Sequence, residues 1–193
     1  MKNAKKIIAL LLCAVLLVAG SVAGTLAYLT STSDTVKNTF TVGNVNIKLE
    51  EYDVDPQTGV KDTSKVVTGL TDLELAPGRK IAKNPFITVD SKSEECWLFV
   101  KIENGLEGAG QIIYAEGWTQ ITGTNYYQYA NKVAAGTKVD VFTQFNCDTT
   151  LDNTALAEFN GKEIKITAYA IQTEGFATVG AAWTAIKGQL GLN

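Results

Sequence analysis

The stretch Cys96–Glu103, CWLFVKIE, is the most strand-like segment of the chain. Side chains two residues apart in a strand share one face. Both resulting faces are largely apolar, with Cys96, Leu98, Val100 and Ile102 on one and Trp97, Phe99 and Lys101 on the other. Such a pattern is typical of a strand that is covered on both sides. The segment therefore predicts a central strand of a β-sandwich.

Two further segments alternate in the same way. Lys162–Ile171 (KEIKITAYAI) is expected to turn Ile164, Ile166, Ala168 and Ala170 toward the core. Near the other end, Phe40 and Val42 alternate, and Val45, Ile47 and Leu49 resume the alternation one residue out of phase. We expect a bulge at Gly43 to join these residues into one strand with a single buried face.

The rest of residues 39–193 reads as short strands separated by turns. Residues 50–65 are expected to form a hairpin, Pro77-Gly78 a turn, and Asn104-Gly105 the start of a loop that runs to about Glu116. Further strands are expected at 86–89, 117–121, 126–129 and 139–145, and residues 151–159 as a short helical or irregular connection. Val179, Ala182, Trp183, Ile186 and Leu190 recur at helical spacing, which predicts a C-terminal helix docked on its own domain.

The chain begins with the pattern of an export signal. Lys2, Lys5 and Lys6 precede an apolar run at residues 7–19, which is too short for a comfortable membrane span of about 20 residues. Small residues precede two competing cleavage points, one after Ala23 and one after Ala27, the latter with Thr25 at the other inspected position. Sequence rules barely separate the two.

A resemblance favours the second point. Residues 24–34 (GTLAYLTSTSD) and 38–45 (NTFTVGNV) resemble the N-terminus of the TasA/camelysin family of exported Gram-positive proteins. Residues 75–86 and 166–176 resemble a turn and a closing strand of the same family. The resemblance implies a SipW-type signal peptidase as a partner, cutting between Ala27 and Tyr28, so that residues 1–27 are the signal peptide. Membrane association is then expected only through the uncleaved signal.

The family also implies an architecture and a role. The resemblance implies a jelly-roll-like antiparallel β-sandwich, here residues 39–193, and an extracellular location at the cell surface or in a biofilm matrix. TasA-like members assemble into fibres, in which a free N-terminal segment is similar to a donor strand for the next subunit. The matching candidate positions are Tyr28, Leu29, Val36 and Phe40, and residues 28–38 are expected to form a loosely held segment that could self-associate or pair with related matrix subunits.

Composition excludes several function classes. The 193 residues include 17 Lys+Arg, 20 Asp+Glu and no histidine. Removal of residues 1–27 takes three lysines and no acid, leaving 14 basic against 20 acidic residues, and this net −6 argues against a nucleic-acid partner. Without histidine, neither a Ser-His-Asp unit nor an imidazole-ligated zinc site can form. We therefore expect no enzyme, no catalytic residue and no cofactor.

Three features leave alternatives open. Cys96 and Cys147 are either two separate core residues or one disulfide of an exported protein. The acids around Asp53 and Asp55 favour a solvated hairpin tip over a calcium site, so no metal site is assigned. Trp118 and residues 126–129 favour cross-strand packing over a sugar-stacking platform. The leading hypothesis is a secreted matrix protein, and the alternative is a monomeric secreted module that binds a glycan or surface ligand.

Overall fold

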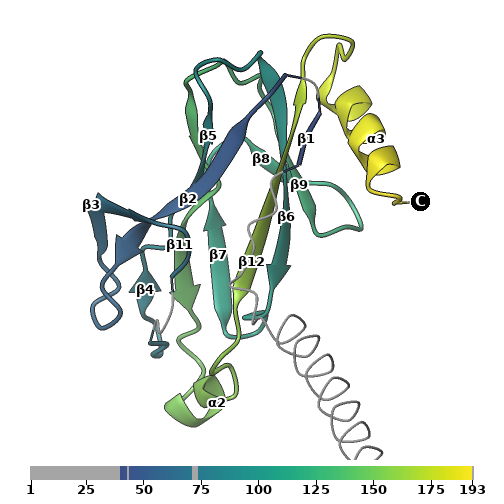
Figure 1. The fold of residues 1–193 in the computed structure, drawn as a ribbon. Coiled ribbons are helices and arrows are strands. Elements are labelled where there is room, and N and C mark those ends of the chain that lie inside the picture. Colours follow the sequence, from purple (N-terminus) through teal and green to yellow (C-terminus); the bar gives the residue numbers. More distant parts are fainter. Residues whose placement is uncertain (1–39, 43, 71–73, 193) are drawn as a thin grey trace, which may run out of the picture. The chain divides into compact units, whose positions relative to one another are not determined.

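The computed structural model describes residues 40–42, 44–70 and 74–192. This part of the chain is mostly β-sheet, arranged in three sheets with one short C-terminal helix (Figure 1). All described strand pairs are antiparallel except the first strand with the last. The expected all-β class is confirmed. The signal peptide, the cleavage residues Thr25, Ala27 and Tyr28, and the donor positions Leu29 and Val36 lie outside the described residues.

The first sheet has five strands in the order β1-β12-β6-β9-β8. These strands are β1 (Phe40–Val42), β12 (Ile164–Gln172), β6 (Cys96–Asn104), β9 (Tyr126–Tyr129) and β8 (Trp118–Gln120). β6 lies in the middle and pairs with β12 along the whole length of both strands, from Cys96 opposite Gln172 to Asn104 opposite Ile164. The prediction of a central strand at residues 96–103 is therefore confirmed.

The other two sheets continue one another. The second contains β10 (Lys138–Asp140), β5 (Pro85–Val89), β2 (Ile47–Val54) and β3 (Lys61–Val67), and the third contains β4 (Lys80–Ile81), β11 (Phe142–Cys147) and β7 (Gly110–Tyr114). The β5–β10 and β4–β11 pairs keep the same register. The Val141 N–H donates to the Pro85 carbonyl at 2.8 Å between them. The gap at residues 82–84 is filled by the buried Asn84, which donates from Nδ2 to the Phe142 carbonyl at 3.4 Å.

Alternation along β6 and β12 separates two apolar clusters. The larger cluster lies between the first sheet and the other two, and it takes one face of both strands, including Leu98, Val100, Ala168 and Ala170. The opposite face contributes Phe99 and Ile171, among others, to a smaller cluster. Both predicted faces of β6 are therefore buried, as its sequence indicated.

The smaller cluster is closed by the C-terminal helix α3 (Val179–Gln189), capped by Thr178, whose hydroxyl accepts the Ala181 N–H at 3.2 Å. Trp183 lies between two rings of the sheet, with centroids 5.5 Å from Phe99 and 5.0 Å from Tyr126. The predicted docking of this helix on its own domain is confirmed (Figure 1).

Other local expectations are confirmed as well. A hairpin joins β2 and β3, a turn lies at Pro77-Gly78, and the connection at 151–159 contains the short helix α2 (Asn153–Ala157).

Two local predictions are wrong. Residues 40–49 do not form one bulged strand, because β1 belongs to the first sheet and β2 to the second. The change of phase marks a crossing between layers, and Gly43 itself lies outside the described residues. The loop expected after Asn104-Gly105 contains β7, whose short run Gln111–Tyr114 has only Ile112 buried.

Candidate functional site

The edge of the first sheet next to β12 is the candidate site. β1 runs parallel to β12, with Phe40 opposite Tyr169 and Val42 opposite Ile171. Phe40 is the one predicted donor residue that the structure describes, and its main chain lies at this edge. A three-residue strand therefore covers one end of a nine-residue strand.

The remainder of that edge is open among the described residues. The Gly105 N–H donates to the Glu163 carbonyl at 2.9 Å, and the Thr173 N–H donates to the Glu95 carbonyl at 2.8 Å. These bonds show that the main-chain N–H and C=O groups of the odd-numbered residues of β12 face β6. Those of the even-numbered residues, such as Ile164 and Ile166, therefore point to the opposite side. No described strand pairs with them there. The charged side chain in this stretch is Lys165, 3.7 Å from Glu163.

The edge strand β3 differs from β12 in its protection. Its pairing with β2 shifts register, because Tyr52 lies opposite Val66 and Asp53 lies opposite Asp62. The extra residues form a kink in which the Asp62 carboxylate accepts the Ser64 N–H at 2.9 Å. Bulges and polar edge strands hinder the addition of another strand. Of these two edges, β12 is therefore the better acceptor.

Trp118, Tyr126 and Tyr129, three of the aromatic residues considered for sugar stacking, pack against other side chains of the protein. Trp118 is 9% exposed and its Nε1–H donates to the Asp140 carbonyl at 2.8 Å. Its ring centroid lies 5.3 Å from that of Tyr129, and Tyr126 packs on Tyr169 and Trp183. These contacts occupy the ring faces on which a sugar would stack, as expected for cross-strand pairs.

The acids of the β2–β3 hairpin stabilise the hairpin itself. Asp53 pairs with Lys65 at 2.5 Å. The Asp55 carboxylate accepts the N–H groups of Thr58 at 2.6 Å and Gln57 at 3.0 Å, and these bonds lower its pKa. No cluster of three metal-ligating side chains occurs within the described ranges. The tip is a capped turn, as favoured from its sequence.

Cys96 and Cys147 are both free and buried, on β6 and β11 of different sheets. The disulfide alternative is therefore not what the structure contains. Burial, aided by the charge of Glu95, raises the pKa of the Cys96 thiol to about 12, and burial also raises that of Cys147. A thiol of this kind is almost entirely protonated near neutral pH and is a poor nucleophile.

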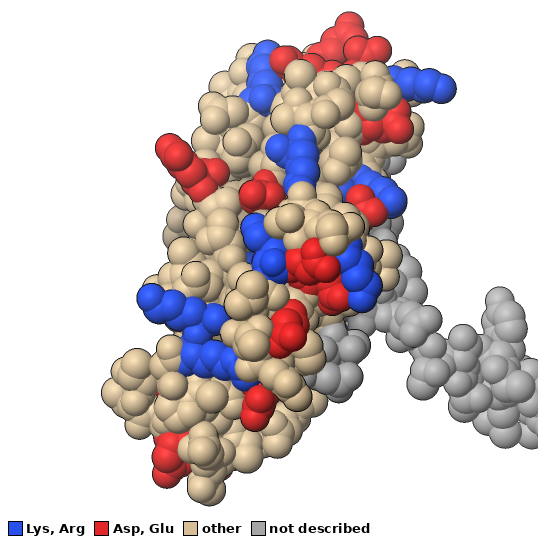
Figure 2. Space-filling view, turned by 90° about the vertical axis from the view of Figure 1, so that its left-hand side faces the viewer, with Lys and Arg blue, Asp and Glu red and all other residues tan. Residues whose placement is uncertain are grey.

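Neither the surface charge nor the hydropathy of the described helices indicates a particular class of partner. Figure 2 shows basic and acidic side chains intermixed on the face of the molecule that it presents. Lys48 and Glu50 form one of the surface ion pairs, at 2.6 Å. Among the described residues, no helix has the length and apolar character needed to cross a bilayer.

Sequence reasoning named Phe40 but missed the acceptor. The alternation of residues 162–171 predicts a strand, but which neighbour it lacks depends on strand order, which no local pattern encodes. Comparisons with protein-family models, curated proteins and solved structures found no match to this chain.

Proposed function

We propose that this chain is a secreted structural or accessory protein of the bacterial cell surface or biofilm matrix. In this proposal it is a jelly-roll-like sandwich that assembles after a SipW-type peptidase removes residues 1–27. The N-terminal segment of one subunit then pairs with the β12 edge of the next. The observation that carries the proposal is the parallel pairing of β1 with an otherwise open edge of β12.

The register of β1 defines what the preceding residues would do. Phe40 lies opposite Tyr169, so the same register places residues 35–39 opposite residues 164–168. This range includes Val36, one of the candidate donor positions. In the same register the N–H groups of even-numbered residues face β12, so Asn38 would donate to Ile166. An added strand of this kind supplies main-chain hydrogen bonds without needing a specific side-chain pocket.

The connection after β1 allows exchange between subunits. Val45 is 1% exposed, the Asn46 N–H donates to Ser93 Oγ at 2.8 Å, and the Glu94 N–H donates to the Asn44 carbonyl at 3.1 Å. The chain is thus anchored from residue 44 onward. Exchange of β1 between subunits would change the backbone direction at Gly43. Each subunit gives one strand and accepts one, and such head-to-tail joining forms a filament when it does not close.

Size-exclusion chromatography and electron microscopy test this assembly. The chain that starts at Tyr28 is compared with one that lacks residues 28–38. Oligomers or filaments are expected only with the segment present. Monomers in both samples would refute the proposal.

Two proline variants provide a matched pair. Asn38→Pro removes an N–H that would face β12 in the extended register, and it should block assembly. Lys37→Pro removes an N–H that would point away from β12 in the same register. It should preserve assembly, because proline is tolerated where no ladder bond is lost. Equal behaviour of the two variants would contradict the register.

A further inference from the structure

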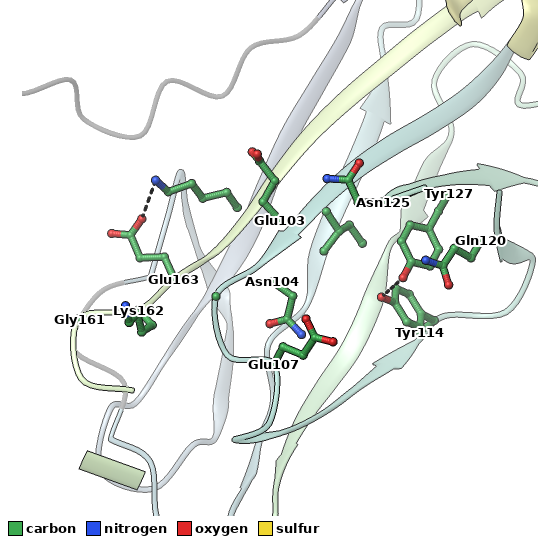
Figure 3. Close-up of a pocket in the computed structure, with 13 residues that line it drawn as sticks. Glu103, Asn104, Glu107, Tyr114, Gln120, Asn125, Tyr127, Gly161, Lys162 and Glu163 are labelled. Atoms are coloured by element: carbon green, nitrogen blue, oxygen red, sulfur yellow. Dashed lines mark hydrogen bonds and ion pairs between the residues drawn. The ribbon is translucent and has the colours of Figure 1, made fainter. Parts of the chain in front are cut away.

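A polar hollow lies where β9 stops short of the end of β6. The last β6–β9 pair is Lys101 with Tyr126, followed by a hydrogen bond from the Ile102 N–H to the Asn125 carbonyl at 2.9 Å. β6 continues to Asn104 without a neighbour on this side in the described chain. The hollow beside it measures about 1000 Å³ (Figure 3).

The main chain of β6 presents one donor and one acceptor to this hollow. The Gly105–Glu163 hydrogen bond shows that the main-chain groups of odd-numbered residues of β6 face β12. The main-chain N–H and C=O of the even-numbered Asn104 therefore point toward the hollow. The Asn104 Oδ1 accepts the Leu106 N–H at 3.0 Å, which leaves its Nδ2 available. A single open residue is too short a ladder to hold an added peptide strand.

Side chains from five further positions supply more hydrogen-bonding groups. Gln120 donates from Nε2 to the Thr124 carbonyl at 2.7 Å, which leaves its Oε1 as an acceptor. The side chains of Asn125 and Glu107 bond to no described residue and border the hollow (Figure 3). The hydroxyls of Tyr114 and Tyr127 lie 2.7 Å apart, so one of the two protons remains free to donate.

The same two tyrosines give the hollow a partly apolar wall. Their rings stack with centroids 4.7 Å apart and an interplanar angle of 25°. Stacking on each other and a bond between the hydroxyls hold both rings in place. A ligand would meet this wall without having to order it, which lowers the cost of binding.

The charges around the hollow largely cancel. Glu103 lies 2.9 Å from Lys101, and Glu163 lies 3.7 Å from Lys165. Glu107 and Lys162 are of opposite sign, and neither forms an ion pair with another described residue. The groups left to a ligand are therefore mainly amides, hydroxyls and main-chain groups, which match neighbouring hydroxyls that both donate and accept.

We propose that this hollow binds a neutral carbohydrate, as a segment of an uncharged polysaccharide. The residues that contact it are Asn104, Glu107, Tyr114, Gln120, Asn125 and Tyr127. The site goes beyond the assembly proposed above and does not depend on it, since none of these residues lies on β1.

Isothermal titration calorimetry with defined oligosaccharides tests the proposal. The chain from Tyr28 is titrated with laminarihexaose, cellohexaose and mannohexaose, and with anionic hexagalacturonate for comparison. At least one neutral hexasaccharide should bind with a Kd of about 1 mM or tighter. Absence of binding by all three neutral sugars at millimolar concentration would overturn the proposal, and so would tighter binding of the anionic sugar.

Two double variants locate the site. Glu107→Ala with Asn125→Ala should weaken binding roughly tenfold or more, because two hydrogen bonds to the ligand are lost. Glu158→Ala with Asn131→Ala removes the same residue types at exposed positions elsewhere and should change the Kd less than about twofold. Unchanged binding by the first variant would overturn the location. Assembly of that variant should remain intact, which separates failure of this site from failure of the β12 edge.

Discussion

Phe40 on β1 lies directly opposite Tyr169 on β12, in the parallel ladder of the described strands. The first described strand thus pairs with the last strand, although almost the whole sequence of the domain separates the two. β12 is anchored on its other side by β6, while the main-chain groups of Ile164 and Ile166 keep an open edge among the described residues. In the assembly proposed above, this edge is where the N-terminal segment of another subunit would pair.

Loss of the buried ion pair between β2 and the connection from β4 to β5 should destabilise the domain. Lys83 Nζ lies 2.7 Å from Glu51 Oε2, and the two side chains are only 12% and 5% exposed. Lys83→Ala leaves a buried carboxylate without a partner, so the free energy of unfolding should fall by about 3 kcal/mol. Urea unfolding measures the change.

The surface pair Lys65–Asp53 is the control, because the lysine side chain is 63% exposed. Lys65→Ala should cost less than about 1 kcal/mol. Equal costs for the two variants would show that burial does not determine the role of Lys83.

Alkaline pH should weaken the fold. Burial raises the pKa of Cys96 from 9.0 to about 12 and that of Tyr169 from 10.0 to about 12. The unfolded chain therefore loses these protons first, so stability is full below pH 9 and falls as the pH rises toward 12. Urea unfolding at about pH 8 and about pH 10.5 should show this loss, and Cys96→Ala should show a smaller one. A free energy of unfolding that does not change with pH would contradict the assignment.

The docking of α3 should depend on Trp183. This side chain packs on Phe99 and Tyr126, so Trp183→Ala should lower the free energy of unfolding by about 2 kcal/mol, less than for a fully buried tryptophan. Thr184→Ala changes the exposed neighbour and should cost less than about 0.5 kcal/mol. Guanidinium unfolding followed by circular dichroism distinguishes the two, and similar losses would mean that the ring contacts do not hold the helix.

The sequence predicted those elements whose pattern is local and complete. β6 is apolar on both faces, β12 alternates over nine residues, and α3 carries a helical apolar stripe, so each could be placed before its partners were known. The capped hairpin tip at Asp55 follows from turn chemistry in the same way.

Features that depend on residues distant in the chain could not be predicted from the sequence. The phase change after Val42 has two physical solutions, a bulge or a crossing between sheets, and only the pairing of β1 with β12 decides between them. β7 was not predicted because only Ile112 of its residues is buried and because the sequence that precedes it is rich in glycine. The hollow beside Asn104 arises from the different lengths of β6 and β9, so no motif marks it.

Cross-linking of mixed single variants tests whether the N-terminal segment of one chain pairs with β12 of another. Val36 and Lys165 are opposite each other in the continued β1–β12 register, and the Lys165 side chain is exposed. Val36→Cys and Lys165→Cys chains carrying tags of different size are mixed, oxidised, and alkylated before denaturation. The native thiols of Cys96 and Cys147 are buried and should not react. Val36→Cys mixed with Lys132→Cys, at another exposed position, serves as the control.

Strand exchange predicts a covalent heterodimer from the first mixture and none from the control. A bond between two different chains can form only if the segment of one reaches β12 of the other. A heterodimer absent from the first mixture, together with a bond within a single chain in the Val36→Cys/Lys165→Cys double variant, would contradict it and show that the segment folds back on its own sheet.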